Sequence, residues 1–166
     1  MGVLDVVRET VDLIGGTLDP RTRIVFNEGA EDLVVRVDRT GLAQLLTNLV
    51  TNAAEASSAG AYIAVTIDAS NLEGGAARAL SLAPGLYCRL LVEDNGPGIP
   101  ADQLGKVFDP FFTTKSQGKG TGLGLSVVSG LAKSWGGTVS VESTLGFGTC
   151  FTVYLPVAEA QLQAAQ

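Results

Sequence analysis

Two asparagines and one aspartate are the side chains in this sequence whose types and spacing could do chemistry together. Asn48 and Asn52 lie four residues apart, so on a helix they would share one face. Asparagine is unfavourable inside a helix because its amide competes for backbone hydrogen bonds, which makes such a pair notable. The carboxamide oxygens are hard ligands of the kind that suits Mg²⁺. The alternative interpretation is two solvated helix residues.

Asp94 follows an apolar run at residues 87–93 that is typical of a strand, so its carboxylate could project from the end of a sheet. An ionised carboxylate only accepts hydrogen bonds. It would therefore select the exocyclic amine of adenine against the carbonyl of guanine. Gly96 and Gly98 come next and leave room for a flat base. An ordinary glycine-rich turn is the alternative.

A glycine cluster at residues 118–124 precedes a helical pattern and could cover phosphate groups. Backbone N–H groups at glycines and at a helix N-terminus favour anions. The cluster does not follow a strand, so a dinucleotide fingerprint is not expected. Its Gly-Lys pair is followed by glycine rather than Ser or Thr, so it is not a P-loop either. Lys115 and Lys119 could meet phosphate oxygens, or they are solvated loop residues.

Hydrophobic periodicity predicts the elements that must position these groups. A first helical pattern runs over residues 3–18 and stops at Pro20. The strongest helix follows Asp38 or Thr40, its candidate N-caps, and ends at residues 57–60, and a third covers residues 123–135. A loose connection is expected at residues 71–84. Strands are expected at residues 23–27, 33–37, 62–67, 87–93, 138–142 and 149–155. This order predicts an α+β fold: a two-layer sandwich whose mixed, mostly antiparallel sheet is covered by helices on one face.

The composition is that of one globular domain with few charges. Of 166 residues 46% are apolar, 17% are charged, and the net charge is −6. A negative charge argues against binding to nucleic acid or to an anionic membrane. No apolar run approaches the ~18 residues of a membrane helix, and no signal-peptide pattern is present. Residues 1–157 are expected to form the domain, and residues 158–166 a frayed or disordered tail.

Cys88 and Cys150 each lie within a strand-like pattern, so we expect buried, reduced thiols in a cytoplasmic protein. With no histidine and only these two separated cysteines, a zinc site is not expected.

Taken in order, the motifs resemble those of sensor histidine kinases. Residues 44–56 resemble the N box, residues 94–98 the G1 box, residues 107–115 the F box, residues 120–125 the G2 box and residues 146–149 the closing Gly-Thr motif. The resemblance spans roughly residues 5–156. It implies the ATP-binding catalytic domain of a two-component histidine kinase of the GHKL superfamily (gyrase, heat-shock chaperone, histidine kinase, MutL). The nitrogen-regulation and hybrid PAS-linked kinases are the most similar subgroup.

The same resemblance implies roles for single residues. Asn52 would be the Mg²⁺ ligand and Asp94 the adenine reader, while Asn48 would line the phosphate side. Residues 108–120 would form a mobile ATP lid. The implied catalytic residues are Asn48, Asn52 and Lys115. The implied ATP contacts are Asn48, Asn52, Asp94, Gly96, Gly98, Ile99, Phe108, Lys119, Gly120, Thr121, Gly122, Leu123, Gly124, Leu125 and Thr149.

Two positions depart from the family pattern. Glu55 and Ala56 stand where many members carry a basic residue and then an aromatic one.

The resemblance implies transfer of the γ-phosphoryl group of Mg-ATP to histidine. Hydrolases and protein-serine kinases of the superfamily typically carry Glu at the position of Asn48, because water or serine needs a base. A neutral imidazole already has a free lone pair. The alternatives are a GHKL-type ATP hydrolase and a nucleotide-binding module without transfer.

The implied partner is a histidine-bearing dimerisation and phosphoacceptor domain, because the chain has no histidine. This domain is expected to precede the sequence in a longer kinase, and a response regulator would be an indirect partner. We expect the isolated domain to be a cytoplasmic monomer without membrane contact.

Overall fold

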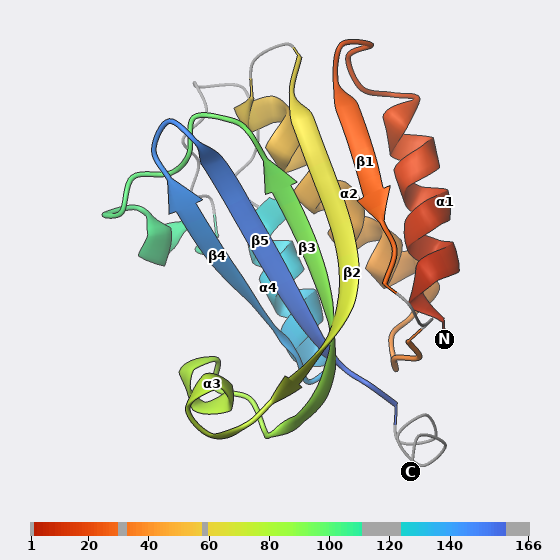
Figure 1. Cartoon of the computed structure of the whole chain (residues 1–166), viewed down its shortest axis with the longest axis vertical. Coiled ribbons are helices and arrows are strands. Elements are labelled where there is room, and N and C mark those ends of the chain that lie inside the picture. Colours follow the sequence, from red (N-terminus) through yellow and green to blue (C-terminus); the bar gives the residue numbers. More distant parts are fainter. Residues whose placement is uncertain (1, 30–32, 58–59, 111–123, 159–166) are drawn as a thin grey trace.

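A five-stranded sheet carries helices on one face in the computed structural model, which describes residues 2–29, 33–57, 60–110 and 124–158 (Figure 1). The strands lie in the order β1-β2-β3-β5-β4. β1 runs parallel to β2, and the other neighbouring pairs are antiparallel. The strands are β1 (Arg23–Asn27), β2 (Tyr62–Leu72), β3 (Gly85–Asp94), β4 (Thr138–Thr144) and β5 (Gly148–Pro156). This arrangement confirms the predicted mixed sandwich.

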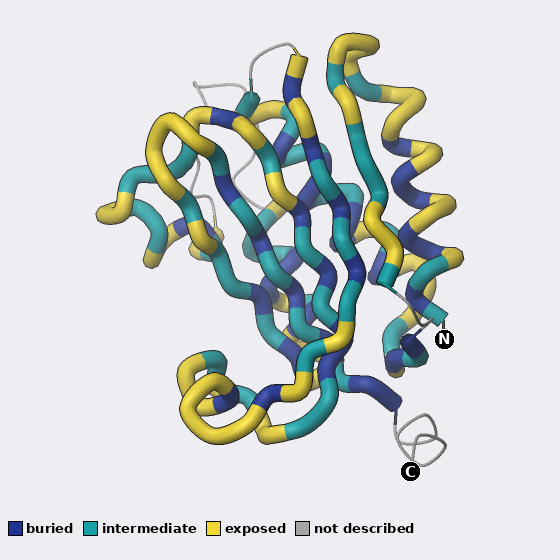
Figure 2. Tube along the Cα trace, in the orientation of Figure 1, coloured by how far each residue is buried: buried dark blue, intermediate teal, exposed yellow. Residues whose placement is uncertain are grey.

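Alternating side chains of the central strands form the sheet side of the core. Ile67 of β2 lies opposite Leu90 of β3, which lies opposite Val153 of β5, and all three are at most 1% exposed. Period-2 alternation sends the intervening side chains to the other face. Figure 2 shows this alternation of buried and less buried positions along the strands.

The helices α1 (Val3–Gly15), α2 (Arg39–Ala56) and α4 (Gly124–Ser134) supply the other layer. α2 is the central one, in contact with α1, α4 and β3, and in Figure 1 both α2 and α4 lie behind the sheet. Its leucines at 42, 45, 46 and 49 are fully buried. The predicted leucine face is therefore the core face of α2. Among the described residues, no helix combines the length and the apolar character needed to cross a membrane.

Asp38 is the N-cap of α2. Its backbone is extended, and its Oδ2 accepts a hydrogen bond from the N–H of Gly41 at 2.7 Å. Thr40, the other candidate, lies inside the helix. We expect Asp38→Ala to lower the free energy of unfolding by about 1 kcal/mol, because one N–H of the first turn loses its partner. Thr40→Ala should leave it unchanged or raise it slightly. Urea denaturation of both variants measures these free energies. An equal loss of unfolding free energy in the two variants would contradict Asp38 as the N-cap.

The strand predicted at residues 33–37 is wrong. Val34 bridges to Gly2 and Val35 bridges to Val157, and each bridge is isolated. The N–H of Val3 bonds to the carbonyl of Leu33. The segment therefore connects the start of α1 with the chain after β5 through single-residue bridges. Because consecutive residues do not pair with one partner strand, no β-ladder forms.

Residues 71–84 are more ordered than the loose connection that we expected. β2 continues to Leu72, and the short helix α3 (Gly74–Ala79) follows. Leu72, Ala77 and Tyr87 form a small buried cluster of their own. In Figure 1, α3 lies at the end of the sheet opposite the carboxyl end of β3.

Smaller differences concern element ends and one cysteine. α1 ends at Gly15, although Leu18 beyond it still packs against the core. Ala158, assigned to the tail, is buried, and its N–H bonds to the carbonyl of Val34. Cys88 is buried as expected, whereas Cys150 is only half-buried. Burial raises the pKa of the Cys150 thiol to about 11, so it is protonated at neutral pH.

Candidate functional site

Asp94 ends β3 as a half-buried carboxylate. Its Oδ1 accepts a hydrogen bond from the N–H of Gly96 at 2.8 Å, and the backbone of Thr149 also hydrogen-bonds to the carboxylate. Burial raises the pKa of Asp94 above its usual range, while these two N–H groups oppose the shift because they favour the ionised form. The two backbone N–H groups thus hold the Asp94 carboxylate in one orientation, and water reaches this hydrogen-bond acceptor only in part.

Residues 94–98 form the turn that follows β3, called the glycine turn below, and it packs tightly at both of its glycines. A Cβ on Gly96 would lie 3.0 Å from Asp94 Oδ1 and 2.8 Å from Ser57 Oγ, so a methyl group there would require these side chains to shift. Gly98 has φ +81°, and a Cβ there would approach the carbonyl oxygen of Thr144 to 2.4 Å. The turn is therefore pressed against the end of α2 on one side and against the β4–β5 hairpin on the other.

Hydrogen bonds to the β4–β5 hairpin hold this turn in place. The N–H of Ile99 donates to Ser143 Oγ at 2.7 Å, and the N–H of Gly146 donates to the carbonyl of Pro97 at 2.8 Å. Ser143 Oγ also lies 2.9 Å from the hydroxyl of Thr149. The predicted residues Ile99 and Thr149 thus belong to one network. Ser143, which joins them, was not predicted, because a serine near the end of a strand gives no distinguishing signal.

Asn48 and Asn52 lie one turn apart on α2, as predicted, beside its leucine face, and both are half-buried. Asn48 Nδ2 donates to the carbonyl of Gly124, the first residue of α4, at 3.3 Å. This bond uses a donor of the amide and leaves its carbonyl oxygen for a ligand. Asn52 lies one helical turn before Ala56, whose carbonyl oxygen borders Gly96. The polar face of α2 therefore runs from the start of α4 toward the glycine turn.

Other predicted site residues are placed in part. The ring of Phe108 packs edge-on against Phe151, with 5.9 Å between the ring centroids, and Leu125 packs against the core. Most of the expected lid at residues 108–120 lies outside the described residues. So do the predicted catalytic residue Lys115 and five predicted ATP contacts: Lys119, Gly120, Thr121, Gly122 and Leu123.

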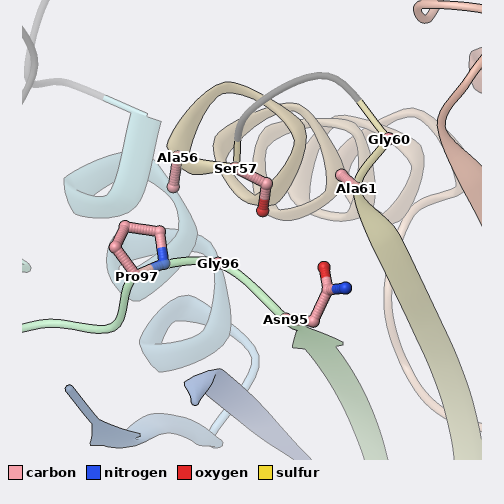
Figure 3. Close-up of a pocket in the computed structure, with 7 residues that line it drawn as sticks. All are labelled: Ala56, Ser57, Gly60, Ala61, Asn95, Gly96 and Pro97. Carbon is pink, nitrogen blue, oxygen red and sulfur yellow. The ribbon is translucent and has the colours of Figure 1, made fainter. Parts of the chain in front are cut away.

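A pocket of about 440 Å³ opens beside the glycine turn (Figure 3). It lies between the end of α2, the start of β2 and the residues that follow β3. The described residues that line it are Ala56, Ser57, Gly60, Ala61, Asn95, Gly96 and Pro97.

The donor and acceptor groups fit an adenine nucleotide. The ordered carboxylate of Asp94 can accept a hydrogen bond from an exocyclic amine, and Gly96, whose N–H bonds to that carboxylate, also lines the pocket at the end of α2. The amide oxygens on α2 fit Mg²⁺, which is commonly held by one or two protein ligands together with substrate phosphates. These features are the ones expected of an ATP-binding α/β sandwich.

The chain belongs to the family described as Histidine kinase-, DNA gyrase B-, and HSP90-like ATPase, whose sequence profile matches residues 37–159. Its curated relatives include sensor kinase CckA of Brucella abortus, 37% identical over 159 residues, which cover 94% of this chain and 17% of that protein. They also include sensor histidine kinase ZraS of Escherichia coli K12, 42% identical over 123 residues, or 74% of this chain and 23% of that protein. The chain thus spans less than a quarter of either relative.

Solved structures agree with this placement. The catalytic domain of histidine kinase ThkA superposes with a TM-score of 0.74 at 31% identity, covering 95% of this chain and 93% of that chain. ThkA in complex with the response regulator TrrA gives 0.72 at 28% identity, covering 95% of this chain and 41% of that chain. The chain corresponds to the ATP-binding catalytic domain of sensor histidine kinases.

Proposed function

We propose that this chain transfers the γ-phosphoryl group of Mg-ATP to a histidine carried by a separate dimerisation and phosphoacceptor domain. The observation that carries the proposal is the amide at position 48. Asn48 lies on the polar face of α2 and binds the first residue of α4. An amide cannot take a proton from water or from serine, but a neutral imidazole needs no such base.

Each group then has a distinct task. Asp94 accepts a hydrogen bond from the adenine amine. Gly96 and Gly98 shape the base pocket, because they let the turn pack closely against the end of α2 and the β4–β5 hairpin. Asn48 lies beside the start of α4, where a helix N-terminus favours phosphate. Asn52 offers its amide oxygen to Mg²⁺, which when bound would neutralise charge that develops on the phosphates. The chain's contribution to the reaction is thus positioning and electrostatic stabilisation.

The partners follow from this chemistry. The chain has no histidine, so the acceptor belongs to another segment or another molecule. The relatives named sensor kinases, and the ThkA complex with a response regulator, support a two-component pathway in which the phosphoryl group passes onward. We place the domain in the cytoplasm, where its substrate ATP is found, and we expect it to be a monomer when isolated.

The test is a phosphotransfer assay with Mg-ATP. We expect the chain alone to gain no phosphate and to hydrolyse ATP far more slowly than the ~1 s⁻¹ of a working enzyme. The acceptor is the dimerisation and phosphoacceptor domain of a related sensor kinase, a pair of helices that carries the histidine and is called the hairpin domain below. Adding it should yield acid-labile phosphohistidine on that domain. A hairpin whose histidine is replaced is the control. Brisk hydrolysis without transfer would instead support the ATP hydrolase.

A further inference from the structure

We propose that the pocket beside the glycine turn admits neutral substituents on the exocyclic amine of adenine. The site would then take N6-substituted ATP as well as ATP. This inference rests on the proposed function, because it places the adenine amine at Asp94. It adds a specificity determinant, the open volume at Ala56 and Ser57, to the base-binding site.

The pocket borders the carboxylate that would bind the amine. Gly96 lines the pocket, and its N–H donates to Asp94 Oδ1 at 2.8 Å. The point where a Cβ of Gly96 would lie is 3.0 Å from Asp94 Oδ1 and 2.8 Å from Ser57 Oγ, and Ser57 lines the pocket as well. Gly96 therefore lies between the carboxylate of Asp94 and the pocket wall at Ser57, in close contact with both.

The wall of the pocket suits an uncharged group. None of its described lining residues carries a charge. Ser57 Oγ lies 3.0 Å from the carbonyl of Ala53, to which it donates, and Asn95 Oδ1 accepts from the N–H of Tyr62 at 2.9 Å. Because these polar atoms already have partners, an apolar substituent could enter without leaving them unsatisfied.

The volume is adequate because the neighbouring side chains are small. Ala56 presents only a methyl group, Gly60 presents none, and Ala61 is buried. The pocket of about 440 Å³ falls within the range of ~300–1,000 Å³ that holds whole drug-sized ligands, so a single aromatic ring is well within it. A secondary amine keeps one N–H, so Asp94 could still accept a hydrogen bond from the substituted base.

Calorimetry with N6-benzyl-ATP and ATP, both with Mg²⁺, tests the inference. We expect the wild-type Kd for N6-benzyl-ATP to lie within about fivefold of that for ATP. Ala56→Tyr places an aromatic ring in the mouth of the pocket and should raise the ratio of the two Kd values by about tenfold or more. Ala76→Tyr, the same change at an exposed alanine of α3, should leave the ratio unchanged.

A second measurement does not depend on these variants. With N6-benzyl-ATP bound, NMR should show contacts between the benzyl protons and the methyl group of Ala61. If wild-type protein bound ATP but rejected N6-benzyl-ATP, the inference about the pocket would be wrong and the proposed function would stand. The same conclusion would follow if Ala56→Tyr left the ratio of Kd values unchanged and NMR showed no contact between the benzyl group and Ala61. Failure to bind ATP itself would instead remove the proposed function.

Discussion

Asp94→Asn should weaken ATP binding by about 30-fold, on the order of 2 kcal/mol, without unfolding the domain. The amide oxygen of the new side chain can still accept the N–H of Gly96, which bonds to Asp94 Oδ1 at 2.8 Å. The amide NH₂ group would then face the adenine amine, so that two donors meet. Preference for ATP over GTP should shrink for the same reason, because an NH₂ group can donate to the guanine carbonyl.

The stability of this variant separates loss of function from loss of fold. Burial raises the pKa of Asp94 in the folded chain above its unfolded value. Ionising Asp94 therefore costs folding free energy as the pH rises through the interval between the two pKa values, and this cost persists at pH 7. Asp94→Asn removes it, so we expect the free energy of unfolding at pH 7 to stay the same or to rise.

Calorimetry with ATP and GTP measures the affinities, and urea denaturation measures the stability. Asp68→Asn is the matched control, because it removes a carboxylate from the same sheet. Asp68 pairs with Arg89 through bonds of 2.7 and 2.6 Å and lies away from the glycine turn. The control should keep full ATP affinity. Equal ATP affinity in wild type and Asp94→Asn would rule out Asp94 as the adenine reader.

The sequence predicted best those parts of the fold that repeat a pattern over many residues. The leucines of α2 mark a buried helix face because their spacing follows the 3.6-residue period over about two turns. Residues 33–37 show the limit of such patterns. They are apolar enough for a strand, but each bridge involves a single residue and a different partner segment. Which segments meet there depends on the whole fold.

The sequence did not predict α3, because its composition is typical of a loop. Gly74 and Gly75 open it, and glycine usually indicates a turn. The helix nevertheless forms, with Ala77 buried against Leu72 and Tyr87, so a local tertiary contact outweighs a weak helical propensity.

The motifs of the candidate site were predictable from the sequence, but the hydrogen bonds that join them to the rest of the fold were not. The order of an asparagine pair, an aspartate before glycines and a glycine cluster pointed to the family, and Asp94, Gly96 and Gly98 do form one turn. The bond from Ile99 to Ser143 joins residues 44 apart in the sequence, and no local pattern encodes it. The nucleotide-binding roles of the predicted residues remain predictions.

Asn52→Ala should lower Mg²⁺-dependent phosphotransfer to the hairpin domain by about 100-fold or more, since a metal ion supplies several kcal/mol of charge stabilisation. The fold should be unaffected. Asn52 is half-buried beside the leucine face rather than on it, and alanine is the better helix former, so the melting temperature should hold or rise. Gln44→Ala is the control, because it removes an exposed carboxamide from the same helix and should transfer phosphate at the wild-type rate.

Initial rates of phosphohistidine formation across a Mg²⁺ titration make the measurement specific. Loss of a metal ligand should shift the half-saturating Mg²⁺ concentration upward, and added Mg²⁺ should recover part of the rate. ATP affinity in the absence of Mg²⁺ should change little, because Asp94 and the glycine turn, which would hold the base, lie on another element. If the rate stayed at the wild-type level while the melting temperature fell, Asn52 would be a structural residue, and Mg²⁺ would have to be held elsewhere.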